Sequence, residues 1–301
     1  MRKTIRVANV VIENLILIII VILLVFAAYA IWDSNQVFAE ADSSNYEIYN
    51  PVNDEESPTF EELRSINPEV ISWLTIYGTK INYPLVQGFD NMKYVNTNAL
   101  GGMSLSGAIF LDYRNSSDFS DFNSILYGHH MEKGAMFGDI DEFENEAFFN
   151  ANKYGNLYYG DKDYGIEIYA FIKTDAYDDT IFSANVSSED GKRNYLSHIE
   201  DNAEFYRDIG VSIDDRLLVL TTCSTYATNG RYILATRITD EVFENVLPQV
   251  EEPRVIDITV VEKIFRFPMW LFTIGLPLLI LIILAIVLYV VGKRKHNRRS
   301  N

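Results

Sequence analysis

The sequence predicts a mainly β domain, a single closed barrel of about eight short strands with one inserted helix, flanked by two transmembrane helices. Three observations predict it. Two uncharged apolar segments, 15–32 and 267–292, are long enough to cross a hydrocarbon core of about 30 Å as helices. Between them, short runs of aromatic and β-branched residues alternate with turn residues. One longer stretch, 187–210, has apolar residues at helical spacing instead.

Basic residues flank both apolar segments and predict their orientation. Arg2, Lys3 and Arg6 precede the first segment, and five lysines and arginines follow the second. By the positive-inside rule both termini are cytoplasmic, so residues 33–266 lie outside the cell. A cleaved signal peptide is the alternative for the first segment, because "VFAEA" at 37–41 resembles a cleavage site. The apolar part of a signal peptide is usually shorter, about 7–15 residues, which favours an uncleaved anchor.

Composition divides the chain into seven parts. We expect a cytoplasmic N-terminus, an anchor, an acidic extracellular stalk, a globular domain, a connector, a second transmembrane helix and a basic cytoplasmic tail. Their ranges are 1–14, 15–32, 33–57, 58–245, 246–266, 267–292 and 293–301.

The exterior segment is strongly acidic. Residues 33–266 hold 17 basic and 41 acidic residues, a net charge of −24. Nucleic acid is therefore excluded as a partner, since its phosphates would be repelled, and the charge also argues against docking on an acidic lipid surface. We expect this segment to be soluble without either span.

The expected elements of the globular domain follow one another in a simple order. A short helix over 59–66 has Glu61 and Glu62 in its first turn and ends at Asn67-Pro68, and a further turn is expected at 69–73. A short acidic helix is predicted over 138–152, and a longer helix over 188–206 between two strands. The strands are predicted in "WLTIYGTKINYPLVQG", "SGAIFLDYRN", "FNSILYGHHM", "NLYYG", "YGIEIYAFIK", "DRLLVLTTC" and "GRYILATRIT".

Cys223 is the only cysteine in the chain, and it ends the apolar run "RLLVLTTC". It has no partner for a disulfide within the chain. An odd cysteine in an extracellular domain is either paired with another chain or a free reactive thiol. A buried, inert cysteine is the ordinary alternative.

Two other reactive side chains also stand at strand ends. His129 and His130 follow the run "SILYG", and Arg231 begins "RYILATRI". A thiol attacks as its thiolate, an imidazole beside it supplies acid–base chemistry, and an arginine stabilises an oxyanion. The three residue types therefore suit acyl transfer, although a core cysteine, a surface histidine pair and a salt-bridged arginine fit the same spacing. Adjacent residues of a strand point to opposite faces, so we expect no metal site at His129 and His130.

Several motifs in order resemble the sortase family. "LTTC" followed eight residues later by Arg231 resembles the core sortase motif, and "YGHHMEKGAMFGDI" (127–140) resembles the class B histidine motif. "INPEVISWLTIYGTKINYPLVQGFDNMKYV" and "SGAIFLDYRN" are similar to class B segments upstream of that histidine, and the helix at 188–206 matches a class B insertion. The resemblance covers about residues 60–240, and it implies an eight-stranded barrel of membrane-anchored cysteine transpeptidases from Gram-positive bacteria.

The resemblance also implies roles for individual residues. Cys223 corresponds to the nucleophile, His129 to the catalytic histidine and Arg231 to the catalytic arginine. Thr221 corresponds to a position that lines the substrate groove. His130 lies at a position that the family fills variably, and Arg237 lies too far along its strand, so both are left outside the catalytic set. No cofactor and no metal are implied.

The implied substrates are secreted proteins with a C-terminal sorting signal, and the implied acceptor is an amine. The motifs are those of class B, whereas a second span is a feature of pilin-assembling sortases, so a peptidoglycan precursor and a pilin lysine both stay open as acceptors. We see no lid motif over 33–60. Two other functions stay open: a catalytically silent assembly scaffold, and a cysteine peptidase that transfers the acyl group to water.

Overall fold

The computed structural model describes residues 2–51, 60–223 and 228–246. Apart from Val246, the predicted connector (246–266) lies outside these residues, as do the predicted second span and the basic tail.

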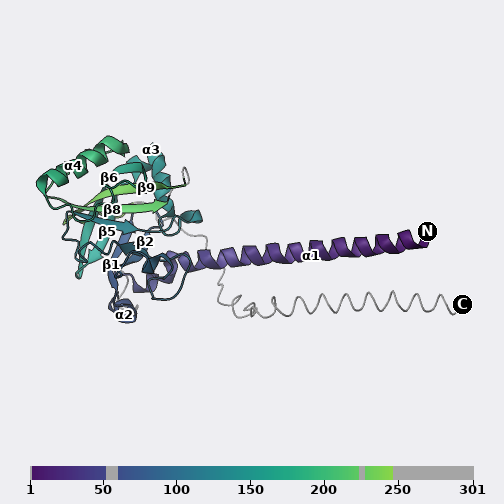
Figure 1. The fold of residues 1–301 in the computed structure, drawn as a ribbon. Helices are drawn as coiled ribbons and strands as arrows, with labels where there is room; N and C mark the ends of the chain where they lie inside the picture. Colours follow the sequence, from purple (N-terminus) through teal and green to yellow (C-terminus); the bar gives the residue numbers. More distant parts are fainter. Residues whose placement is uncertain (1, 52–59, 224–227, 247–301) are drawn as a thin grey trace. The chain divides into compact units, whose positions relative to one another are not determined.

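Eight strands form a closed barrel (Figure 1). Hydrogen-bonded neighbours follow the order β5-β1-β2-β3-β4-β8-β9-β6, and pairing of β6 with β5 closes the ring. Two neighbouring pairs, β2–β3 and β4–β8, are parallel, and the others are antiparallel. The strands are β1 (Val70–Ile76), β2 (Asn82–Val86), β3 (Ile109–Leu111), β4 (Asn123–Tyr127), β5 (Tyr154–Tyr159), β6 (Lys162–Asp175), β8 (Arg216–Cys223) and β9 (Gly230–Thr239). The predicted closed eight-stranded barrel is confirmed, and a ninth strand, β7 (Ala203–Tyr206), pairs with β6 alone.

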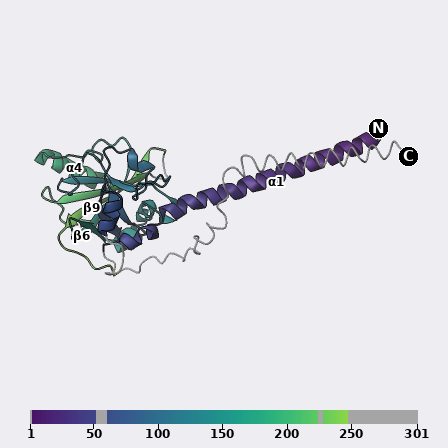
Figure 2. The same ribbon diagram turned by 90° about the horizontal axis from the view of Figure 1, so that it is seen from below.

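Strand alternation gives the barrel wall an inner and an outer apolar face. Along β8, Leu218 and Leu220 belong to the main core, whereas Leu217 and Val219 belong to a second cluster with Tyr195 of α4 (Glu189–Asn202). This helix therefore covers the outer face of the sheet around β6 and β8 (Figure 2). The near-continuous apolar run of β8 is explained by burial on both faces.

The helices largely follow the expected positions. α2 (Phe60–Ile66) confirms the helix predicted over 59–66, but β1 begins at Val70, where a further turn was expected. The helix predicted over 138–152 is divided into a 3-10 helix, η5 (Gly138–Glu144), and α3 (Glu146–Ala151). They are separated by Asn145, whose side chain accepts hydrogen bonds from the first backbone N–H groups of α3.

The inserted helix is shorter than expected. Ser188 caps the start of α4, but the helix ends at Asn202 rather than at 206. Residues 203–206 form β7 because they pair with the exposed edge of β6, a tertiary contact that overrides the local helical spacing.

The segment after the first apolar stretch differs from the expected stalk. α1 (Arg2–Ala41) continues without interruption to Ala41, and it is followed by the 3-10 helices η1 (Ser43–Asn45) and η2 (Glu47–Tyr49). Ala41 and Tyr46 are buried in the main core. The described part of the predicted stalk is therefore folded, and its end belongs to the barrel domain.

Only the apolar stretch Ile5–Ala41 of α1, among the described residues, is long and apolar enough to cross a membrane. This is a statement about length and composition, and a signal sequence would satisfy it equally.

Tyr83 joins three parts of the domain through its hydroxyl group. The hydroxyl donates to the Ala41 carbonyl oxygen (2.9 Å) and accepts from the backbone N–H of Met136 (3.0 Å). All three residues are buried. The tyrosine thus connects the end of α1 and β2 to the segment before η5.

We expect Tyr83→Phe to lower the free energy of unfolding by about 1–3 kcal/mol, because two buried backbone groups lose their partner. Thermal unfolding of the full chain in detergent, followed by circular dichroism, measures the loss. Tyr177→Phe is the matched control, since Tyr177 is 77% exposed. Equal midpoints for the two variants would contradict this role of Tyr83.

Candidate active site

Three adjacent strands bring His129, Cys223 and Arg231 to one edge of the barrel. In the parallel pair β4–β8, Tyr127 lies opposite Thr221, and the Gly128 N–H continues the ladder by donating to the Thr221 carbonyl (3.2 Å). His129 and Cys223 each stand two residues beyond this pair. In the antiparallel pair β8–β9, Cys223 lies directly opposite Arg231. Residues 94 positions apart in the sequence are therefore neighbours.

His129 is oriented by the loop between β2 and β3. Its Nε2 lies 2.9 Å from the carbonyl oxygen of Val95, the last residue of η3 (Lys93–Val95). A carbonyl only accepts, so this contact assigns the proton to Nε2 and leaves Nδ1 for exchange with a reacting group. The His129 carbonyl in turn accepts from the Phe137 N–H (3.0 Å), which attaches the loop after β4 to the start of η5.

Two glycines allow this loop to pack closely. A Cβ on Gly128 would lie 2.6 Å from the ring of Phe137, which is fully buried, and a Cβ on Gly138 would lie 2.2 Å from the Met131 carbonyl. Neither neighbour has room to move away. The glycine before His129 is thus required for the position of the histidine.

Arg231 is bordered by β6 and by the connection from β6 to α4. Thr174 is its register partner on β6, and the Thr174 hydroxyl donates to Asp178 (2.7 Å). His198 of α4 contacts the same carboxylate through Nε2 (2.8 Å). Burial acts to raise the pKa of Asp178, but hydrogen bonds from His198, the Ile181 N–H and Thr174 outweigh it and hold the pKa below its usual value. These hydrogen bonds fix the position of the β6–α4 connection next to Arg231.

A buried carboxylate, Asp112, supports the end of β4 that precedes His129. Asp112 is fully buried and accepts two hydrogen bonds from the Arg114 guanidinium (2.8 and 2.7 Å) and one from the Tyr127 hydroxyl (3.1 Å). Arg114 also donates to the Phe182 carbonyl (3.1 Å). The Tyr127 ring lies between the rings of Phe110 and Phe182 in a stacked row. Asp112 therefore connects the end of β4, just before His129, to the β6–α4 connection.

His130 lies apart from this constellation. Its Nε2 is 2.9 Å from Asp141 of η5, and its ring lies 6.3 Å from that of Tyr232. Tyr232 belongs to the main core, whereas the next residue, Ile233, belongs to the outer cluster with α4. His130 therefore contacts the inner side of β9, not the side on which Arg231 stands.

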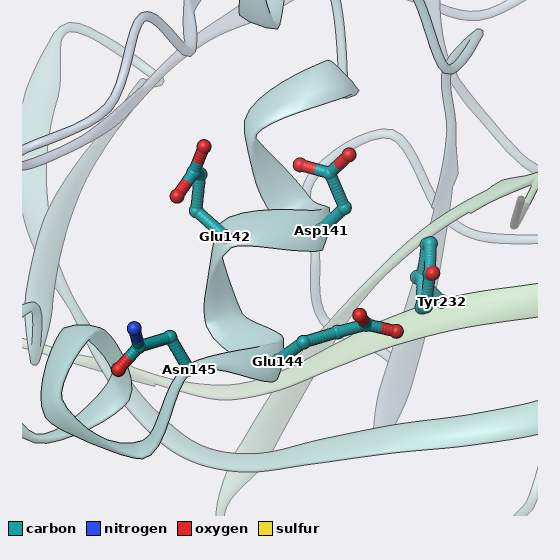
Figure 3. A pocket seen from close by; sticks show the side chains of 5 residues that line it. All are labelled: Asp141, Glu142, Glu144, Asn145 and Tyr232. Carbon is teal, nitrogen blue, oxygen red and sulfur yellow. The ribbon is translucent and has the colours of Figure 1, made fainter.

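Acidic side chains line an open pocket on this inner side, near His130 (Figure 3). Lys173 lies 3.0 Å from Glu144. Burial acts to raise the pKa of Glu144, but hydrogen bonds from Tyr232 and Lys173 outweigh it and lower the pKa. The lining residues are Asp141, Glu142, Glu144, Asn145 and Tyr232.

The fold also places Thr221, the remaining site candidate, and Arg237, which the sequence analysis left outside the catalytic set. Thr221 is buried, and its hydroxyl has no hydrogen-bond partner among the described residues. Arg237 pairs with Glu167 and lies 3.9 Å from Asp215, which agrees with a structural role. Sequence reasoning did not find Val95, Asp112 or Asp178. Each supports the site through a contact distant in sequence, and no local motif marks them.

A closed eight-stranded β-barrel with a thiol, an imidazole and a guanidinium at the ends of adjacent strands defines a class of acyl-transfer enzymes, the sortases. The sortase domain model matches residues 74–239. Sortase B of Listeria monocytogenes is 34% identical over 177 residues, which cover 58% of this chain and 70% of that protein.

Solved structures agree with this match. Sortase B of Clostridium perfringens is 36% identical, with a TM-score of 0.58 over 60% of this chain and 100% of that one. Sortase B from the type II pilus of Streptococcus pneumoniae is 42% identical, with a TM-score of 0.53 over 60% of this chain and 99% of that one. The chain belongs to the sortase family and is a cysteine transpeptidase of the class B type.

Replacement of Gly128 should test the packing beneath the histidine. We expect Gly128→Ala to lower transpeptidation at least tenfold, because the added methyl group meets the Phe137 ring and displaces His129. Gly160→Ala is the control for the added methyl group, since nothing lies within 4 Å of its Cβ position; its φ is +56°, so any loss in this variant measures backbone strain, which does not arise at Gly128. Initial rates with a sorting peptide measure the effect, and unchanged activity of Gly128→Ala would contradict this account.

Asp112 should make stability dependent on pH. Burial acts to raise its pKa, but hydrogen bonds from Arg114 and Asn91 outweigh it and lower the pKa. A lowered folded-state pKa gives stability that is present above the unfolded value of about 3.9 and lost as the pH falls through the folded value. We expect Asp112→Asn to lose about 3–5 kcal/mol at pH 7, and less at pH 3.

Urea unfolding of parent and variant at both pH values measures this difference. Asp179→Asn, at an exposed neighbour of Asp178, is the control. A stability gap between parent and Asp112→Asn that is the same at pH 7 and pH 3 would rule out the ionised carboxylate as its source.

Proposed function

We propose that this chain is a membrane-anchored sortase that cleaves a C-terminal sorting motif of secreted proteins and joins them to an amine. The observation that carries the proposal is the strand register, which puts Cys223 opposite Arg231 and His129 at the end of the strand beside Cys223. Both termini are cytoplasmic and the barrel is extracellular in this proposal, with residues 15–32 and 267–292 as the two spans.

The proposed reaction has two steps. The Cys223 thiolate attacks the carbonyl carbon of the scissile amide, and the C–N bond breaks to leave a thioester. The imidazolium of His129 gives its Nδ1 proton to the departing amine while Nε2–H stays bonded to the Val95 carbonyl, and Arg231 donates hydrogen bonds to the substrate carbonyl or the oxyanion. An incoming amine then attacks the thioester, His129 takes its proton, and the C–S bond breaks to restore the thiolate. The acceptor decides whether the product is an amide or, with water, an acid.

Thr221 is proposed to line the substrate groove. Its buried hydroxyl lacks a partner among the described residues, and a buried polar group without a partner requires an explanation. A substrate amide that reaches the end of β8 would supply that partner.

Two acceptor classes fit the proposal. A sortase B of 42% identity comes from a type II pilus, which favours the lysine of a neighbouring pilin. The class B type favours an amine of a peptidoglycan precursor equally. Competition between a lysine side-chain amine and a crossbridge peptide for the same acyl-enzyme would decide between them.

The nucleophile is tested by trapping. A library of five-residue sorting motifs is incubated with the full chain, and mass spectrometry identifies the acyl group on Cys223 and so the bond that is cut. The same incubation without the amine distinguishes the two activities, because a transpeptidase transfers the acyl group to the amine and a peptidase transfers it to water. A Cys223→Ala variant with full biological activity would instead support the scaffold.

The three site residues should respond differently to replacement. We expect no acyl-enzyme from Cys223→Ala, and almost none from His129→Ala, because an unprotonated amine is a poor leaving group. Arg231→Lys should lose roughly 10²–10³ in rate, since a lysine lacks the planar fork that holds an oxygen. His130→Ala, the matched control, should keep most of the activity. Activity in His129→Ala but not in His130→Ala would reverse the assignment.

A further inference from the structure

The last turn of α1 is fixed against the barrel domain. Ala41 is buried in the main core, and the Asn45 side chain donates to the Ala39 carbonyl (2.7 Å), which satisfies a carbonyl at the end of the helix. Glu40, between the two alanines, accepts a hydrogen bond from the hydroxyl of Ser104 (2.9 Å), a residue of the loop between β2 and β3. The helix therefore ends in contact with a loop that also reaches the candidate active site.

Glu40 completes a chain of buried hydroxyl groups. The hydroxyl oxygens of Ser104 and Ser106 lie 2.8 Å apart, and both serines are buried. An ionised carboxylate only accepts, so the Ser104 hydroxyl donates to Glu40 and its oxygen accepts from Ser106. Without Glu40 one of the two hydroxyl protons would lose its acceptor, which is costly for a buried group.

The segment that starts at Ser104 lies directly behind the oxygen that holds His129. The Gly107 N–H donates to the Ser104 carbonyl (3.2 Å), and a Cβ on Gly107 would lie 2.6 Å from the Val95 oxygen. The Ser104 N–H also donates to the carbonyl of the residue after Val95 (3.1 Å). The Val95 oxygen lies 2.9 Å from Nε2 of His129. Glu40 is thus connected to the imidazole through one turn of the β2–β3 loop.

The loop that follows the histidine is also supported from α1. Two of its non-glycine residues have left-handed backbone, with φ of +62° at Lys133 and +54° at Met136. Such a conformation persists only where surrounding contacts hold it. The Tyr83 hydroxyl accepts from the Met136 N–H (3.0 Å) and donates to the Ala41 carbonyl (2.9 Å). The Lys133 ammonium lies 4.9 Å from the ring centroid of Phe38. The end of α1 therefore supports both strained positions.

These two sets of contacts meet at His129. Met136 forms a bridge with the residue after the histidine, and the Phe137 N–H donates to the His129 carbonyl (3.0 Å). The first set therefore reaches the imidazole ring, and the second reaches the backbone of the same residue. They begin at consecutive residues of α1, Glu40 and Ala41.

We propose that the last turn of α1 is a positioning element for His129, with Glu40 and Tyr83 as its positioning residues. The inference rests on the catalytic role proposed above for His129. The helix end maintains the tautomer that carries its proton on Nε2 and leaves Nδ1 to exchange a proton with the substrate. Proton transfer depends on this geometry, so loss of either set of contacts lowers kcat and leaves the affinity for the sorting peptide unchanged.

The tautomer is measured by nuclear magnetic resonance on the full chain in detergent, with nitrogen-15 histidine at about pH 9, where an ordinary imidazole is neutral. His129→Ala assigns the signal. We expect a single Nε2-protonated form in the parent and a mixture of tautomers in Glu40→Ala and in Tyr83→Phe. Glu40→Gln should resemble the parent, because its amide oxygen still accepts from Ser104. A single Nε2-protonated form in either Glu40→Ala or Tyr83→Phe would overturn the proposal.

Kinetics supply a second measurement. We expect Glu40→Ala and Tyr83→Phe to lower kcat for a sorting peptide at least threefold, with KM changed less than twofold. The controls are Asp33→Ala, at an exposed acid of α1, and Tyr77→Phe, at a buried tyrosine whose hydroxyl donates to the Phe243 carbonyl (3.0 Å). Each control should keep the tautomer and the kcat of the parent. Equal kcat in the two variants and their controls would overturn the proposal.

His129→Ala separates this inference from the function on which it rests. If that variant cleaves the sorting peptide as the parent does, the proposed function fails. The tautomer comparisons of Glu40→Ala with Asp33→Ala, and of Tyr83→Phe with Tyr77→Phe, still decide whether the end of α1 holds the histidine.

Discussion

The parallel pairing of β4 with β8 is the interaction on which the site depends. Neither strand carries a complete site, and the segments are 94 residues apart in the sequence. Parallel strands in register end at the same edge, so one ladder aligns His129 with the end of β8. The hairpin-like pairing of β8 with β9 then adds Arg231. A shift of one residue in either register would move a reactive side chain to the other face of the barrel.

The site is supported from both sides by carboxylates that each accept several hydrogen bonds. Asp112 connects β4 to the β6–α4 connection, and Asp178 ties that connection to Thr174 and His198. Each carboxylate is partly or fully removed from water, and the hydrogen bonds it accepts outweigh that cost. These contacts fix the position of the β6–α4 connection relative to the strands that carry His129 and Arg231.

The N-terminal segment is part of the same assembly. Ala41 and Tyr46 are buried in the main core cluster, and Tyr83 binds the end of α1 to the segment before η5. The helix that is long enough to cross a membrane thus ends in the domain without a flexible spacer. α1 and the barrel domain are therefore joined through a few buried contacts.

The sequence by itself determined the barrel, the order of its strands along the chain and the residues of the candidate site, because strand alternation and the Cys223, His129 and Arg231 motifs are local patterns. Tertiary structure decided the rest. Residues 203–206 form a strand because they pair with the edge of β6. The acidic stretch after residue 33 is folded because Ala41 and Tyr46 pack into the main core cluster. The Val95, Asp112 and Asp178 contacts join segments whose proximity exists only once the ring is closed, so no window of the sequence contains them.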